Sequence, residues 1–148
     1  MKKHKTFNIV VIILVTLIAA GFGIFAGTAY RAKFIGGIFG LISGIIVAGL
    51  YLRALAFFTS RRYRKSIIWL LGTITAGLCG ILSTTFIHIL TITIVAMFTE
   101  ATKESLTDLD GFFPLIILIA EGIGLVVGLL AGGFITAIYV SSLRKVQK

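Results

Sequence analysis

Four long apolar stretches account for most of this chain and leave it few ways to fold. They run over residues 7–30, 34–58, 67–98 and 112–140. A helix needs roughly 20 apolar residues to cross a hydrocarbon core about 30 Å thick, and each stretch is long enough to do so. With 58% hydrophobic and 13% charged residues, a soluble domain of 148 residues could not bury so much apolar surface. The sequence therefore predicts an all-α integral membrane protein with four transmembrane helices.

The segments between these stretches are short, so we expect one transmembrane domain over residues 1–148, with the lipid bilayer as its surroundings. The basic start followed by an apolar run also fits a signal peptide. That run is longer than the 7–15 residues usual for the hydrophobic region of a signal peptide, so a retained helix is expected.

Positive charge gathers at one set of helix ends. Three basic clusters precede the first stretch, separate the second from the third and follow the fourth, whereas the segment between the third and fourth is acidic. The excess of lysine and arginine on one side predicts a multi-pass protein of the cell membrane with both termini in the cytoplasm. This placement accounts for the net charge of +9 without nucleic acid as a partner. The central cluster is a candidate cytoplasmic surface for anionic lipid and comprises Arg61, Arg62, Arg64 and Lys65.

Aromatic residues lie near the predicted membrane borders, where their amphipathic rings can settle at the headgroup level. They are Tyr30, Tyr51, Tyr63, Trp69 and Tyr139. These positions agree with the predicted spans and indicate no specific function.

The second and fourth stretches share a glycine pattern. Gly40, Gly44 and Gly49 recur 84 residues later as Gly124, Gly128 and Gly133. A fainter match at an offset of 56 relates the first stretch to the third. We therefore expect two parallel helical-hairpin repeats, over residues 7–58 and 67–140, because copies separated by two crossings enter the membrane in the same direction.

Glycines spaced four residues apart form stripes on one helix face and let neighbouring backbones approach closely. This glycine-zipper pattern predicts a compact four-helix bundle. Stripes that face outward would instead drive oligomerisation or line a narrow pathway. The two stripes comprise Gly36, Gly40 and Gly44 in one helix and Gly124, Gly128 and Gly132 in another.

Glu121 is the most unusual residue, since it lies within an apolar stretch about 13 Å along the fourth helix. An acidic residue near the centre of a membrane helix costs about 2.5–3.5 kcal/mol. It must therefore be buried against protein, hydrated or protonated. Glu121 is either a functional site or a structural group that hydrogen-bonds a neighbouring helix.

The third stretch carries the second polar candidate, His88, with Thr84 and Thr85 one turn before it. A His88–Glu121 pair that exchanges a proton or binds a cation is one interpretation. The alternative is a purely structural role. In that case the hydroxyl groups bond back to their own helix and the histidine donates a hydrogen bond to a neighbouring helix.

Several function classes lack support. No nucleophile with its base, no metal-spaced ligands and no phosphate-binding loop occur, so we expect neither an enzyme, nor a cofactor, nor a metal site. Cys79 is the single cysteine.

The stretch around Glu121 resembles the acidic helix of rotary-ATPase proteolipid subunits, but the predicted topology is opposite to theirs. Residues 74–86 are similar to part of small fluoride channels, without the asparagine of that family's second helix.

Two function hypotheses follow from these features. The first is a structural or accessory membrane subunit that packs through glycine against itself or another membrane protein. The second is a small oligomeric ion or proton channel or transporter that uses Glu121, with help from His88, because four helices are few for a transporter alone.

Overall fold

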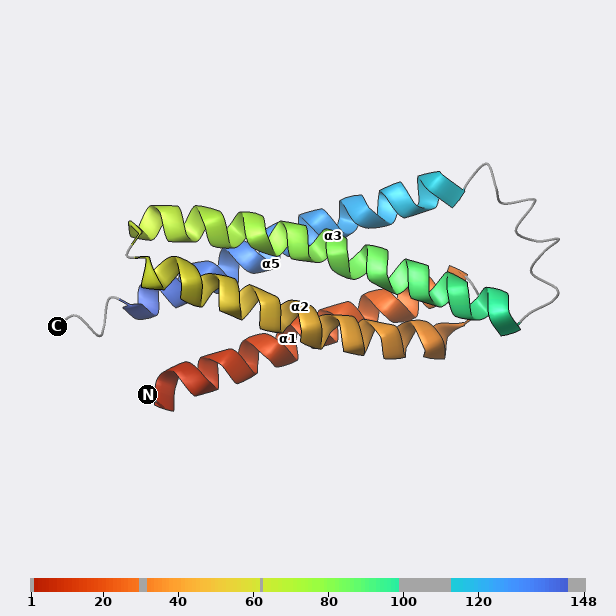
Figure 1. Ribbon diagram of the computed structural model, residues 1–148, viewed down its shortest axis with the longest axis horizontal. Coiled ribbons are helices and arrows are strands. Elements are labelled where there is room, and N and C mark those ends of the chain that lie inside the picture. The colour runs from red at the N-terminus through yellow and green to blue at the C-terminus, as the bar shows by residue number, and fades with distance from the viewer. Residues whose placement is uncertain (1, 30–31, 62, 99–112, 144–148) are drawn as a thin grey trace.

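The computed structural model describes residues 2–29, 32–61, 63–98 and 113–143. These form four helices: α1 (Lys2–Ala29), α2 (Lys33–Ser60), α3 (Lys65–Phe98) and α5 (Phe113–Leu143) (Figure 1). All four are long and apolar enough to cross a membrane. The predicted all-α architecture with four membrane-length helices is thus confirmed. Of the predicted spans, residues 30 and 112 lie outside the described ranges.

The helices form a bundle made of two tightly packed pairs. α1 begins and α5 ends at the same end of the bundle, which we call the terminal end (Figure 1). α1 packs along α2, α3 packs along α5, and the two pairs meet chiefly through α2 and α3. Because α2 ends and α3 begins at the terminal end, the start of α2 and the start of α5 lie at the opposite end.

Glycine makes the α1–α2 contact close. A Cβ atom added at Gly40 would lie 2.8 Å from the Cα atom of Ala20, and one added at Gly44 would lie 2.6 Å from the Cα atom of Thr16. Real Cβ atoms do not approach backbone so closely, so only glycine fits at these positions. The α2 glycines and their α1 partners are Gly36 with Gly23, Gly40 with Ala19 and Ala20, and Gly44 with Thr16.

The α3–α5 contact is built in the same way. A Cβ atom at Gly128 would lie 2.5 Å from the carbonyl oxygen of Ala76 and 3.0 Å from the Cα atom of Gly77. The glycine stripes of α2 and α5 thus face helices of the same chain. The α5 glycines and their α3 partners are Gly124 with Gly80 and Thr84, Gly128 with Ala76 and Gly77, and Gly132 with Ala76.

Several contacts of one pair correspond to contacts of the other through constant offsets in residue number. The offset from Gly23 to Gly80 is 57, and the offset from Gly36 to Gly124 is 88. The same two offsets convert the contact of Ala19 with Gly40 into that of Ala76 with Gly128. They also align identical residues, such as Thr28 with Thr85, Leu41 with Leu129 and Tyr51 with Tyr139.

This register differs by one helical turn from the sequence match at 84, which aligns Gly40 with Gly124 instead of Gly128. A pattern with glycine at every fourth position matches itself when it is shifted by four, so glycines alone do not fix its register. The packing partners do fix it. Descent of the two pairs from one repeated unit remains a prediction.

Tyr51 connects the two pairs, since its side chain points from α2 into the interior of the bundle toward α5. Its side chain is only 2% exposed. The hydroxyl group lies 2.6 Å from Oγ1 of Thr136 and donates to the carbonyl oxygen of Gly132 at 3.1 Å. The sequence placed Tyr51 by its distance from the helix end, which does not reveal the face of the helix that it occupies.

We expect Tyr51→Phe to lower the free energy of unfolding by about 1 kcal/mol, because a typical intramolecular hydrogen bond contributes about 0.5–1.5 kcal/mol net. Unfolding by sodium dodecyl sulfate in mixed micelles, followed by Trp69 fluorescence, measures it. The indole N–H of Trp69 donates to the carbonyl oxygen of Gly133 at 3.2 Å, so the emission reports on the α3–α5 contact.

The control is Tyr63→Phe, since Tyr63 is exposed at the terminal end. It should leave the unfolding curve in place. Equal stability of the Tyr51 and Tyr63 variants would contradict a bridging role for the Tyr51 hydroxyl.

Candidate functional site

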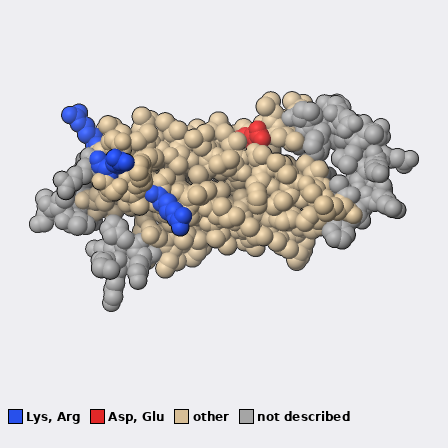
Figure 2. Space-filling view, in the orientation of Figure 1, with Lys and Arg blue, Asp and Glu red and all other residues tan. Residues whose placement is uncertain are grey.

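Glu121 lies in the half of α5 nearer the opposite end, and its side chain is half-buried between α3 and α5. Its Oε1 atom accepts a hydrogen bond from Oγ1 of Thr85 at 2.9 Å. Figure 2 shows one acidic side chain on the surface of the described part, away from the basic end of the bundle. The structure therefore joins two of the four polar candidates, Glu121 and Thr85, at an outer rim of the α3–α5 pair.

The Thr85 hydroxyl group has one hydrogen and two acceptors within reach, because the carbonyl oxygen of Ile81 lies 3.0 Å away. Either the hydrogen is divided between them, or the hydroxyl donates to Ile81 while a neutral Glu121 carboxyl group donates to Thr85. A glutamine amide can replace the neutral acid in the second arrangement. The site thus accommodates a carboxyl group that acts as a hydrogen-bonding group without transferring a proton.

His88 lies one turn from Thr85 on α3 but faces the interior of the bundle. Its side chain is only 3% exposed. It lines a cavity of about 360 Å³ together with residues of α1 and α5, among them Phe25 and Ala120. His88 and Glu121 therefore approach the α3–α5 contact from different sides.

Thr84 is buried against the glycine contact and does not bond the carboxyl group of Glu121 in this structure. Its hydroxyl group donates to the carbonyl oxygen of Ile81 at 2.8 Å. A Cβ atom at Gly124 would lie 2.6 Å from Cγ2 of Thr84, so this threonine fills the space that the glycine leaves. Thr84 serves packing, whereas its neighbour Thr85, turned by about 100° around the helix, reaches Glu121.

The candidate basic surface lies at the terminal end, where lysine and arginine side chains gather on the face shown in Figure 2. Arg61 and Arg64 are exposed and Lys65 is half-buried. The Arg61 guanidinium lies 5.2 Å from the centroid of the Phe57 ring. Arg62 lies outside the described residues.

Within the described ranges, no group of three or more histidine, cysteine, aspartate or glutamate side chains is placed to hold a metal ion. Cys79 is a buried free thiol on α3.

Sequence reasoning missed a polar contact between α2 and α3. The hydroxyl oxygens of Ser43 and Ser83 lie 2.6 Å apart, and both side chains are buried. Ser43 stands alone in an apolar segment of α2, whereas Ser83 directly precedes Thr84 and Thr85 on α3, and only the packing shows that the two serines meet. This bond fastens the two helix pairs to each other near the middle of the bundle.

No protein-family model, curated protein or solved structure matches this chain. The function proposed below is therefore inferred from the geometry of the site.

Proposed function

We propose that this chain is an integral protein of the cell membrane that acts as a structural or accessory subunit and binds a second copy or another membrane protein. The outer surface of the bundle supports the membrane location. Large apolar side chains are widely exposed there, including Leu130, which is 71% exposed. Such a surface is unfavourable in water and suited to hydrocarbon.

The proposed orientation has the terminal end in the cytoplasm. Arg53, Arg61, Arg64 and Lys65 lie toward this end, whereas Lys33 begins α2 at the other. The positive-inside tendency supports this orientation. The basic surface would face anionic lipid headgroups, where each charge contributes about 1 kcal/mol.

The position of the Glu121 side chain is the main support for the subunit proposal. The glycine stripes are occupied within the chain, so they leave no close-packing face of their own for a partner. The half-buried carboxyl group, by contrast, lies at the rim of the α3–α5 pair. An acidic group exposed to hydrocarbon costs on the order of 2.5–3.5 kcal/mol. A neighbouring helix that covers this rim and donates a hydrogen bond would remove much of that cost.

We expect Glu121→Gln to assemble normally and Glu121→Leu to weaken assembly about tenfold, because glutamine retains the hydrogen-bonding group and leucine removes it. Light scattering on protein purified in mild detergent, over a range of protein concentrations, measures the assembly. Thr85→Val, which removes the bond that orients the carboxyl group, should act in the same direction as Glu121→Leu. Thr93→Val is the matched control, since the exposed Thr93 hydroxyl group bonds only back to Ile89 among its described contacts.

A small channel or transporter is the second candidate, favoured by the cavity that reaches His88. In this case Glu121 would exchange the ion or proton, with His88, Thr84 and Thr85 around it. Proton and cation flux in proteoliposomes separates the two proposals. Flux that Glu121→Gln abolishes while assembly is intact identifies a transporter, whereas unimpaired assembly of Glu121→Leu contradicts the subunit proposal.

A further inference from the structure

The bundle is closed between α2 and α3 but open between α1 and α5. The offsets of 57 and 88 make these two seams equivalent: Ser83 corresponds to Ala26, and Ser43 corresponds to Ala131. Where the α2–α3 seam has its buried serine bond, the α1–α5 seam therefore has two alanines. α1 and α5 do meet at the terminal end, where the ring centroids of Phe7 and Tyr139 lie 5.4 Å apart.

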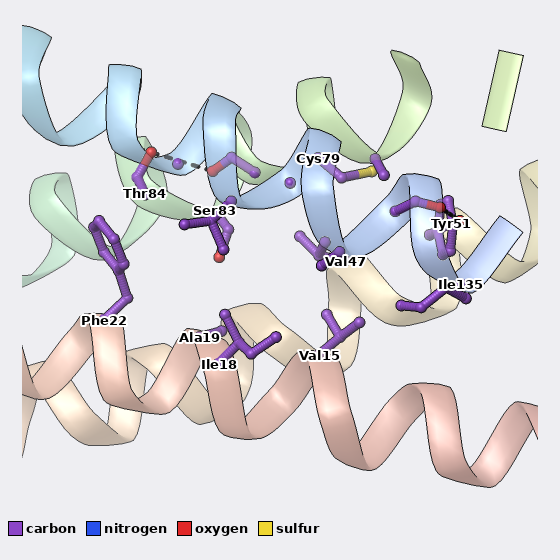
Figure 3. A pocket seen from close by; sticks show the side chains of 17 residues that line it. Val15, Ile18, Ala19, Phe22, Val47, Tyr51, Cys79, Ser83, Thr84 and Ile135 are labelled. Carbon is purple, nitrogen blue, oxygen red and sulfur yellow. Dashed lines mark hydrogen bonds between the residues drawn. The ribbon is translucent and has the colours of Figure 1, made fainter. Parts of the chain in front are cut away.

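Two cavities lie along this α1–α5 seam. The inner cavity, of about 80 Å³, is lined by all four helices and lies between the α1 side chains and the glycine-rich faces of α3 and α5 (Figure 3). The outer cavity, of about 360 Å³, continues toward the opposite end and is lined by α1, α5 and His88. Phe22 lines both cavities, so the two spaces are neighbours in one seam.

Hydroxyl groups along the seam are already engaged within the protein. Tyr51 bonds Thr136 and Gly132, and Ser83 bonds Ser43. Thr84 and Thr28 both bond back to their own helices. A water molecule needs two to four polar partners to occupy a cavity, and cavities with apolar walls stay dry. Apart from the His88 ring in the outer cavity, the described walls of the seam are apolar or bonded within the protein, which suits an apolar occupant.

The volumes of the two cavities, about 80 and 360 Å³, favour a single hydrocarbon chain over a helix. A helix with its side chains is about 10–12 Å across. A methylene chain has the thickness of one carbon contact, about 4 Å, and can pass between side chains and glycine backbone. From Thr28 to Val15 the seam follows α1 for about 20 Å, slightly more than the roughly 15 Å depth of one leaflet.

We infer that the α1–α5 seam binds one acyl chain of a bilayer lipid, which enters sideways at the level of Thr28, passes Phe22 and ends in the inner cavity. The inference rests on the proposed membrane location and is independent of the role of Glu121. The acyl chain fills the space between α1 and α5. In the corresponding α2–α3 seam, protein side chains fill that space. The lipid thereby becomes part of the packing of the bundle.

The test uses a phosphatidylcholine with a diazirine at the end of one acyl chain, incorporated into proteoliposomes with the full-length protein. After illumination, mass spectrometry maps the adducts. The ratio of adducts at Val15 and Phe22 to those at the exposed Leu130 measures occupancy of the seam against general lipid contact. We expect Val127→Phe to lower this ratio about tenfold, because the larger ring fills the inner cavity and removes the chain's van der Waals contacts.

Val126→Phe is the matched control, since Val126 is exposed on the outside of α5, whereas Val127 lines the inner cavity. It should leave the ratio unchanged. If Val127→Phe does not fold, Ala131→Leu fills the same cavity with a smaller side chain. If the ratio of seam adducts to Leu130 adducts is equal in the wild type and the filled variants, the seam site is overturned. Adducts on Leu130 in the same experiment still support the membrane location. Absence of adducts on Leu130 overturns both.

Cys79 provides a second readout, because it lines the inner cavity. A charged, membrane-impermeant thiol reagent should not modify it in the folded wild-type protein. Rapid modification would reveal a hydrated pathway in the seam and overturn the acyl-chain site.

Discussion

Replacing Gly128 with leucine is expected to separate α3 from α5 and to destabilise the protein by about 3 kcal/mol or more. The new Cβ atom would lie 2.5 Å from the carbonyl oxygen of Ala76 and 3.0 Å from the Cα atom of Gly77. Both neighbours are backbone atoms of a regular helix, which cannot rotate away as a side chain can. The midpoint of unfolding in sodium dodecyl sulfate, followed by Trp69 fluorescence, should fall far below that of the wild type.

Gly122→Leu is the matched control on the same helix. Nothing lies within 4 Å of a Cβ atom added at Gly122, so this leucine should leave the fold intact. In the α1–α2 pair, Gly40→Leu and Gly49→Leu form an equivalent set, because Gly40 meets backbone and Gly49 meets open space. Similar stability of the Gly128 and Gly122 variants would show that α3 and α5 do not pack as described.

Leu55→Ala is expected to lower the free energy of unfolding by about 1–3 kcal/mol, less than the usual 2–5 kcal/mol for a core leucine in a water-soluble protein. Leu55 is 1% exposed and packs near Gly72, where an added Cβ atom would lie 2.9 Å from its Cδ2 atom. At the proposed membrane location the unfolded helices keep apolar surroundings, so the variant loses packing contacts without the transfer energy from water. The same denaturation experiment measures the loss.

Leu50→Ala on the same helix is the control, because Leu50 is 51% exposed. It should change the free energy of unfolding by no more than about 0.5 kcal/mol. A loss of 4–5 kcal/mol for Leu55→Ala would instead indicate that the unfolded reference state exposes this helix to water.

The number of helices and their approximate limits could be predicted from sequence because they depend on the length of apolar runs alone. The α1–α2 and α3–α5 registers could not, since a glycine pattern of period four matches itself when it slides by one turn. Side chains such as Ala19, Thr16 and Ala76 select among the registers. They are small residues without an obvious pattern, and only packing shows which glycine each one meets.

The polar site was partly predictable for a similar reason. Glu121 is conspicuous in any apolar helix, and the sequence predicted that it is buried against protein, hydrated or protonated. The sequence offered Thr84, Thr85 and His88 within five residues of α3. Thr84 and His88 are four residues apart and share one face of α3, whereas Thr85 is turned by about 100° from Thr84. Choosing Thr85 required knowledge of the rotation of α3 against α5.

The division of the bundle into two pairs also bears on how the chain is made. α1 and α2 are joined by a short connection, and their glycine contacts require no residue beyond Ser60. Contacts close in sequence form early because little loop entropy opposes them. During synthesis, the first pair can therefore close while the ribosome is still translating α3 and α5. The order of folding would then follow the order of translation. Tyr51 and Ser43 would already lie on the surface of the folded first pair when the second pair docks against it.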